Sequence, residues 1–345
     1  RTVLVVTTVG LIGTSALLWV QAATGGHVWV LLGLFSVQQA FFAVNQPTRS
    51  AVIPKLVGED LLPAANSLNM TVMQAGAIAG PLVAGALIPV LGYEWLYLID
   101  TLTLFATLSA VVRLPRLPVE GATRGAPGLR SIAEGLGYLR GQPVLMMSFV
   151  VDLVAMVFGM PRALFPEIAH ESFSGPEEGG LAFAVLFAAI PAGSVIGGVL
   201  SGWVSRVSRQ GLAVIVCILV WGGAITVFGV ATALADLWPH VMLGVAAVML
   251  MVGGAADMAS AAFRMSMLQS AADDALRGRL QGIFLVVVVG GPRIADVSHG
   301  VAAASAGTAV AAAGGGVLVV VGTVVAAIAV PSFVRYRVTT SRAGP

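Results

Sequence analysis

Ionisable residues occur inside long apolar stretches of this sequence, at positions where a charged side chain is costly. These residues are Asp100, Asp152, Arg162, Asp257, Arg293 and Asp296. Placing a charge at the centre of a bilayer costs about 2.5 to 3.5 kcal/mol on insertion scales, so such residues are usually retained for a function. Carboxylates and guanidinium groups at such positions can take up protons or pair with a charged molecule, and each of these residues is a candidate for that role.

Asp152 is the candidate for proton coupling or for contact with a substrate. It lies about eight residues into an apolar stretch, which is roughly 12 Å along a helix from the nearer end. A carboxylate at that depth is partly desolvated, which could raise its pKa far enough for it to accept a proton. The alternative is a structural role, in which Asp152 is the partner of a neighbouring helix or of backbone groups.

Arg293 and Asp296 form a second candidate group, because residues three positions apart share one face of a helix and can pair. The preceding run Gly290-Gly291-Pro292 could bend the helix and expose backbone carbonyl groups towards a cavity. The spacing leaves a functional and a structural role equally open for this pair.

Three further charges lie closer to the ends of their stretches. Arg162 follows Pro161, so it could extend to the membrane interface as an anchor or contact an anionic substrate. Asp100 is a candidate for an outer gate and Asp257 for an inner one. For both carboxylates the alternative is hydrogen bonding to nearby loops.

The elements that hold these residues follow from composition. Of 345 residues, 58% are hydrophobic and 10% are charged, whereas a soluble domain carries about 25% charged residues. A helix needs about 20 apolar residues to span a bilayer. We predict an all-α polytopic membrane protein with about ten transmembrane helices, at 2–22, 27–46, 66–90, 94–113, 144–165, 181–203, 211–234, 240–262, 281–303 and 308–331.

The basic residues predict the orientation of these helices. All but two of the 18 Lys and Arg residues fall on one side of the membrane if Arg1 lies on that side. Because Lys and Arg accumulate in cytoplasmic loops, we expect both termini of the chain to be cytoplasmic. The same assignment places Arg264 in a cytoplasmic loop with Arg277 and Arg279. The charges are dispersed among loops, so no nucleic-acid surface is expected despite the net charge of +2.

The chain divides at one polar segment rich in Gly, Pro and Arg. We predict an N-terminal bundle of four helices over 1–113, a cytoplasmic linker over 114–143, a six-helix bundle over 144–334 and a cytoplasmic tail over 335–345. Gly80-Pro81 recurs as Gly291-Pro292, and acidic pairs at 59–60 and 273–274 precede the two helices that contain these Gly-Pro pairs. This repeat aligns the first four helices with the last four, so two of an expected twelve helices would be missing at the front.

Two motifs resemble the major facilitator superfamily. The spacing of Gly76, Gly80, Pro81 and Gly85 is similar to the Gly-Pro motif in the fifth helix of that superfamily's antiporters. The run 198–203, followed by Arg206 and Arg209, resembles the second copy of its loop motif, although Gly202 stands where an Asp is usual. The glycines favour close helix packing, and they could also form the interface at which the two halves rock.

Further strings resemble the enterobactin-exporter-like branch of bacterial efflux proteins. They are 47–54 with 62–66, 156–161 with 164–166, and 277–279 with 290–293. Arg1-Thr2-Val3-Leu4 is similar to the end of the first loop motif. The resemblance implies a proton-driven exporter of small molecules, such as a siderophore or a drug, in a bacterial plasma membrane.

The sequence contains no phosphate-binding loop, no metal-spaced His and Cys set and no hydrolase motif. We therefore expect no enzymatic activity, no cofactor and no bound metal. The expected partners are a small-molecule substrate, protons and the lipid bilayer, with the protein acting as a monomer. The alternatives are the membrane subunit of an ATP-driven exporter and a truncated membrane protein that does not transport.

Overall fold

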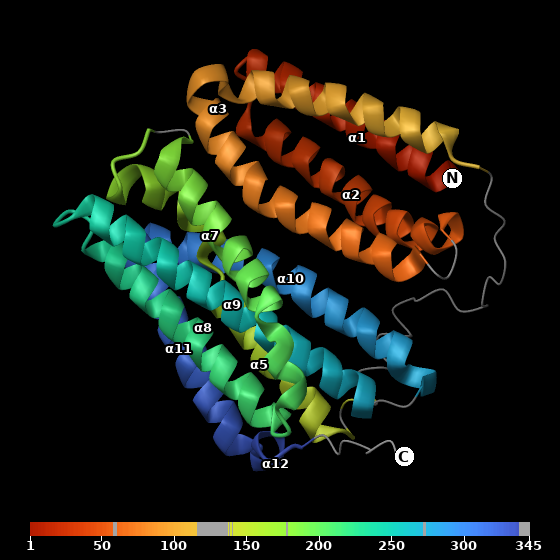
Figure 1. Cartoon of the computed structure of the whole chain (residues 1–345). Coiled ribbons are helices and arrows are strands. Elements are labelled where there is room, and N and C mark those ends of the chain that lie inside the picture. The colour runs from red at the N-terminus through yellow and green to blue at the C-terminus, as the bar shows by residue number, and fades with distance from the viewer. Residues whose placement is uncertain are drawn as a thin grey trace. The chain divides into compact units, whose positions relative to one another are not determined.

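The computed structural model describes residues 1–57, 61–115, 137, 139, 141–176, 179–271 and 274–337, and these residues form helices joined by short turns (Figure 1). Eight stretches in this part of the chain are long and apolar enough to cross a membrane. One of them, Thr71–Arg113, has 43 residues, about twice the length that one span needs. The prediction of an all-α polytopic membrane protein is confirmed.

The first three long helices are α1 (Thr2–Ala23), α2 (Val28–Leu56) and α3 (Leu62–Arg113). α3 covers two predicted spans, and its φ/ψ angles leave the helical region at Gly92 (φ 71°). Glycine adopts a positive φ without the steric strain that a Cβ atom causes, so the chain turns at this residue. The two halves of α3 on either side of Gly92 match the predicted spans 66–90 and 94–113 in position.

The later helices begin with α5 (Pro143–Phe158), which stops earlier than the predicted span 144–165. A 3-10 turn (Pro161–Leu164), the short α6 (Phe165–Glu167) and one turn of π-helix (Ile168–Ser172) continue that span. The long helices that follow are α7 (Gly180–Val199), α8 (Gln210–Ala233), α9 (Pro239–Ala271), α10 (Asp274–Ala306) and α11 (Thr308–Ala329). A 3-10 turn (Ser201–Arg206) follows α7, and the short α12 (Pro331–Val334) follows α11.

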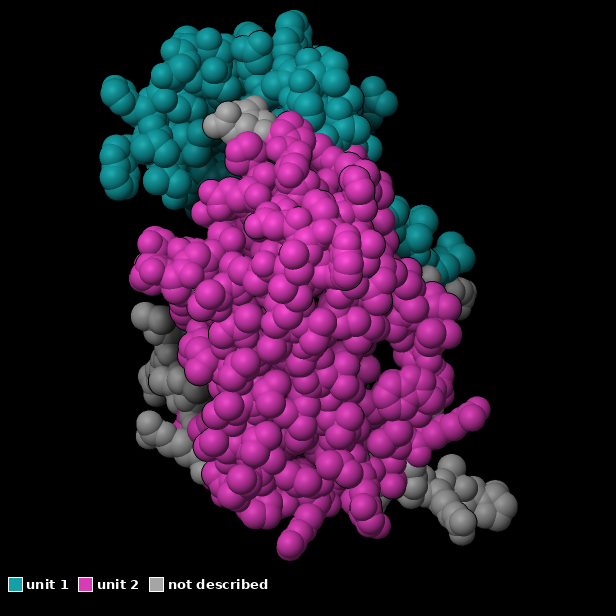
Figure 2. Space-filling model, turned by 90° about the vertical axis from the view of Figure 1, so that its left-hand side faces the viewer, with its two compact units in different colours: residues 1–76, 83–123 teal, residues 77–82, 124–345 magenta. Residues whose placement is uncertain are grey.

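The described chain forms two compact units, coloured teal and magenta in Figure 2. Unit 1 comprises Arg1–Gly76 and Val83–Thr123, and unit 2 comprises Ala77–Leu82 and Arg124–Pro345. Most of the predicted linker 114–143, the acidic pair 59–60, Asp273 and the tail beyond 337 lie outside the described residues.

Glycines allow close backbone contacts between helices of unit 2. A methyl group added to Gly193 of α7 would strike the carbonyl oxygen of Met251 in α9, and one added to Gly254 of α9 would strike that of Ile190. The Ser194 hydroxyl also donates a hydrogen bond of 3.1 Å to the Gly254 carbonyl. Small side chains at these positions allow two backbones to approach, as is common between helices in membranes.

Aromatic side chains fill the interior of unit 2. Phe165, Trp221, Phe228 and Phe263 are each at most 1% exposed. The Phe165 ring packs edge-on against Phe228 at 5.7 Å between centroids, a geometry that aromatic rings favour. This core supports α5, α8 and α9 from the inside and positions their polar residues.

Candidate functional site

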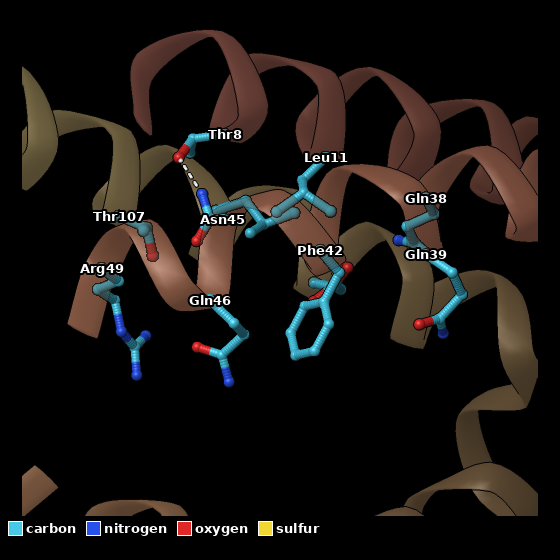
Figure 3. Close-up of a pocket in the computed structure, with 11 residues that line it drawn as sticks. Thr8, Leu11, Gln38, Gln39, Phe42, Asn45, Gln46, Arg49 and Thr107 are labelled. Carbon is cyan, nitrogen blue, oxygen red and sulfur yellow. Dashed lines mark hydrogen bonds between the residues drawn. The ribbon is translucent and has the colours of Figure 1, made fainter. Parts of the chain in front are cut away.

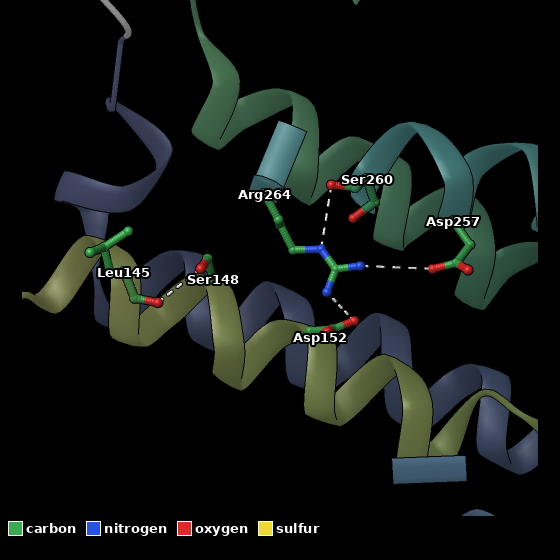
Figure 4. Close-up of polar contacts among 6 residues, drawn as sticks. All are labelled: Leu145, Ser148, Asp152, Asp257, Ser260 and Arg264. Atoms are coloured by element: carbon green, nitrogen blue, oxygen red, sulfur yellow. Dashed lines mark hydrogen bonds and ion pairs between the residues drawn. The ribbon is translucent and has the colours of Figure 1, made fainter. Parts of the chain in front are cut away.

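A buried ion cluster joins α5 and α9 in unit 2 (Figure 4). The Arg264 guanidinium forms an ion pair through Nη1 with Oδ1 of Asp152, and its Nη2 lies 3.9 Å from Oδ1 of Asp257. Its Nε donates a hydrogen bond of 3.4 Å to the Ser260 carbonyl oxygen. One cation therefore lies between two carboxylates, one from each helix.

Helical spacing explains why these groups meet. Asp257, Ser260 and Arg264 occupy positions i, i+3 and i+7 of α9, which share one face of a helix. Asp152 belongs to the buried face of α5, together with Ser148. The Ser148 hydroxyl donates its hydrogen bond to the Leu145 carbonyl oxygen at 2.8 Å, so it does not donate one to the Asp152 carboxylate.

The cluster differs in exposure from one end to the other. The Arg264 and Asp152 side chains are 5% and 2% exposed, whereas that of Asp257 is 31% exposed. Among the described atoms, Oδ2 of Asp152 is buried without a hydrogen-bond partner. With both carboxylates ionised the cluster carries one more negative than positive charge, and an unbalanced buried charge is most easily neutralised by binding a proton.

The expected loop position of Arg264 is wrong, because the residue lies within α9 and is buried. In the count of basic residues that orients the helices, Arg264 is one of the loop arginines, so the sequence does not reveal its buried position in a helix. The signal that could have found it is its spacing of seven residues from Asp257, which places both on one helix face. The structure also brings together Asp152 and Asp257, which the sequence assigned to separate roles.

Arg162, Arg293 and Asp296 lie elsewhere in unit 2. Nη1 of Arg293 is 3.6 Å from Oδ2 of Asp296, and these side chains are 62% and 36% exposed. The Arg162 guanidinium carbon lies 5.9 Å from the centre of the Phe187 ring. α10 is continuous through Pro292, and it packs against the 3-10 turn that carries Arg162.

Asp100 belongs to unit 1, where its Oδ2 accepts a hydrogen bond of 2.5 Å from the buried Ser15 hydroxyl of α1. The carboxylate lines a polar pocket of about 280 Å³, and Figure 3 shows most of the other residues that line it. Asn45 in its wall donates hydrogen bonds to Thr7 (2.9 Å) and Thr8 (3.3 Å). The remaining lining residues are Leu11, Gln38, Gln39, Phe42, Gln46, Arg49, Leu104 and Thr107.

The two Gly-Pro motifs have different surroundings. A methyl group added to Gly291 would lie 2.7 Å from Cβ of Met156 in α5, so α10 and α5 touch closely there. A methyl group added to Gly76 or Gly80 meets open space among the described residues, and helical φ/ψ angles continue through Pro81. Gly85 is buried.

No group of three or more His, Cys, Asp or Glu side chains within the described residues is arranged to hold a metal ion.

The comparisons agree with the architecture. The family model described as Major Facilitator Superfamily matches residues 1–295. Proteins named Enterobactin exporter EntS, from Shigella boydii serotype 18 and Escherichia coli O157:H7, are 30% identical to this chain over 285 residues. That alignment covers 80% of this chain and 64% of each relative, so the chain spans less than two thirds of the relatives' length. With a match over most of its residues and a fold of apolar spanning helices, the chain belongs to the Major Facilitator Superfamily.

Proposed function

We propose that this protein exports a small amphipathic molecule from the bacterial cytoplasm by proton antiport, through alternating access across the plasma membrane. The observation that carries the coupling step is the position of Arg264 between Asp152 and Asp257. The relatives named as enterobactin exporters favour a siderophore as the first cargo to test.

The cluster can couple a proton to a movement because its contacts depend on charge. When both carboxylates are ionised, Arg264 is held to α5 by Asp152 and remains near Asp257 on its own helix. Protonation of Asp152 removes the ion pair that joins α5 to α9, so the two helices become freer to separate. Loss of that proton restores the pair, and the two charge states then favour two arrangements of the helices.

Asp257 is the partly exposed member of the cluster, and a proton could enter the cluster through it. Its side chain is 31% exposed, while Asp152 is buried. In this proposal a proton reaches Asp257 first and passes to Asp152 as Arg264 moves between them. Both termini face the cytoplasm, as the distribution of basic residues indicates.

Enterobactin accumulation in inside-out membrane vesicles tests the proposal. The natively expressed protein should accumulate enterobactin when the vesicle lumen is acidic, and a protonophore should abolish accumulation even with ATP present. Asp152→Asn keeps the shape of the side chain but cannot exchange a proton, so it should remove the dependence on the gradient. Asp236→Asn is the matched control, because Asp236 is an exposed residue between α8 and α9.

Each contrary outcome identifies a rival. Accumulation that needs ATP and survives the protonophore would show an ATP-driven exporter. Gradient-dependent transport that is unchanged in Asp152→Asn would remove the cluster from coupling. No transport of enterobactin, or of a panel of amphipathic drugs, would favour a membrane protein without transport activity.

A further inference from the structure

A buried histidine lies where α5, α10 and α11 pack against one another. His299 of α10 is 4% exposed. The other three histidines of the chain are exposed, and they are His27, His170 and His240. A methyl group added to Gly315 of α11 would lie 2.8 Å from Nε2 of His299 and would strike the carbonyl oxygen of Phe158 in α5. The imidazole ring and the end of α5 therefore meet beside this glycine.

The hydrogen bond of the ring determines which nitrogen carries a hydrogen. Nδ1 of His299 lies 3.0 Å from the Ala295 carbonyl oxygen. Because a carbonyl oxygen only accepts hydrogen bonds, Nδ1 is the donor, and Nε2 of the neutral ring is an acceptor. Nε2 is buried and has no hydrogen-bond partner among the described atoms. A buried acceptor without a donor is costly, so the neutral ring leaves one polar atom unsatisfied.

The Phe158 carbonyl group faces the same ring and is also an acceptor. Phe158 is the last residue of α5, so no N–H group within that helix reaches its carbonyl oxygen. Pro161 follows three residues later and has no N–H group to donate. The Phe158 backbone is placed to accept a hydrogen bond from the charged form of His299. A proton on Nε2 would therefore convert two facing acceptors into a donor and an acceptor.

Few other titratable groups surround the ring. Asp296 on α10 acts on it electrostatically, and α11 has no titratable residue. The Asp296 carboxylate and the two carbonyl oxygens favour the imidazolium form, while burial opposes it. The titratable residues on the remaining described parts of α10 and of the elements packed against it are Arg293 on α10, Arg162 in the turn after α5, Asp152 on α5, and His240, Asp257 and Arg264 on α9.

We propose that His299 is a proton-binding site, in which the imidazolium donates through Nε2 to the Phe158 carbonyl and fastens the end of α5 to α10. The inference goes beyond the proposed function, in which the coupling proton binds at Asp152. In the orientation proposed above, these ends of α5 and α10 lie toward the outer side of the membrane. Acid outside the cell would then fasten α5, the helix that carries Asp152, and restrain its movement.

Solid-state nuclear magnetic resonance of the protein in zwitterionic lipid bilayers tests the site directly. Isotope labels are placed in the nitrogen atoms of the histidine rings and in the carbonyl carbons of phenylalanine. The signals that vanish in His299→Gln belong to His299. We expect them to change from neutral imidazole to imidazolium as the sample is taken from about pH 8 to about pH 5. The dipolar coupling between Nε2 and the Phe158 carbonyl carbon should strengthen over the same range.

Two neighbouring glycines provide a variant and its matched control. Gly315→Ala places a methyl group against both Nε2 and the Phe158 carbonyl, whereas Gly314→Ala places it in open space. Gly315→Ala should weaken the coupling and lower the midpoint of the titration by about one pH unit, a tenfold loss of proton affinity. Gly314→Ala should change neither. Asp296→Asn should lower the midpoint and keep the coupling, and it tests the site even if Gly315→Ala does not fold.

A His299 ring that stays neutral down to about pH 5 in the unaltered protein would overturn the proposal. Formation of the imidazolium with an unchanged coupling to the Phe158 carbonyl would overturn it as well, because the proton would then fasten nothing. The spectra need neither a proton gradient nor a cargo. Their failure leaves coupling at Asp152 intact, and a failure of coupled transport does not remove the site at His299.

Discussion

Replacing Arg264 by Gln should destabilise unit 2 more than any change of an exposed arginine. The guanidinium forms an ion pair with Asp152, approaches Asp257 and donates a hydrogen bond to the Ser260 carbonyl. Glutamine is shorter and uncharged, so the substitution leaves Asp152 buried without its cation.

The magnitude follows from burial. Removing one partner of a buried ion pair costs about 3 to 5 kcal/mol, and solvent screening does not reduce it here because the two side chains are 5% and 2% exposed. In the double variant Asp152→Asn with Arg264→Gln, both buried charges are absent. We expect the double variant to recover about 2 to 3 kcal/mol relative to the sum of the single changes, a coupling within the range for contacting residues.

Unfolding by sodium dodecyl sulfate in mixed micelles, followed by circular dichroism, measures these differences. Arg209→Gln is the control and should change the free energy of unfolding by less than about 0.5 kcal/mol, as surface substitutions do. A loss below about 1 kcal/mol for Arg264→Gln, or strict additivity in the double variant, would refute the reasoning. Either result would mean that the two side chains do not form a buried pair in the membrane.

Two further predictions concern packing and hydrogen bonding. Gly193→Ala should lower the free energy of unfolding by about 1 to 3 kcal/mol, because the new methyl group strikes the Met251 carbonyl. The control Gly223→Ala places its methyl group in open space and should be neutral or stabilising. A thermal melt of both variants compares them. Ser15→Ala should lower the free energy of unfolding by about 1.5 to 3 kcal/mol, the range for a hydrogen bond to a charged group, because Asp100 loses a hydrogen bond of 2.5 Å. Unchanged stability in the same melt would show that water replaces the hydroxyl.

The helices could be predicted from the sequence because a bilayer imposes a length that is visible in one dimension. Each predicted apolar stretch overlaps a long helix, although α5 ends before the stretch 144–165 does, and the gap predicted between 90 and 94 contains the turn at Gly92. The extension of helices beyond the apolar stretch could not be predicted. α9 continues to Ala271 and α2 to Leu56, because helical hydrogen bonding does not stop where hydrophobicity falls.

The candidate site was only partly visible in the sequence. Asp152 and Asp257 stood out because carboxylates are rare in apolar stretches, but their proximity depends on how α5 packs against α9. Arg264 resembled a loop residue because it follows a long apolar stretch and precedes further arginines. Spacing along one helix reveals a shared face, while the partner on another helix is set by tertiary packing.

The Gly-Pro motifs illustrate the same limit. Gly80-Pro81 and Gly291-Pro292 are alike in sequence, but only Gly291 has a neighbouring side chain close enough to exclude a methyl group in the described structure. The conformational freedom of glycine is a local property, whereas its use in close packing depends on what lies opposite. A motif match therefore predicts that two helices can approach and does not identify the residue where they do.

The helices of unit 2 differ in whether they carry charged residues, and this difference indicates which of them can move. α7, α8 and α11 contain no charged residue, and glycines bring α7 against α9 and α8 against α11. Asp152 belongs to α5, Asp257 and Arg264 to α9, Arg293 and Asp296 to α10, and Arg162 to the turn after α5. Separating Asp152 from Arg264 requires α5 to move relative to α9, and the backbone contacts between α7 and α9 resist any motion of α9 alone. We therefore expect α5, with α10 packed on it at Gly291, to be the part that responds when the cluster gains or loses a proton.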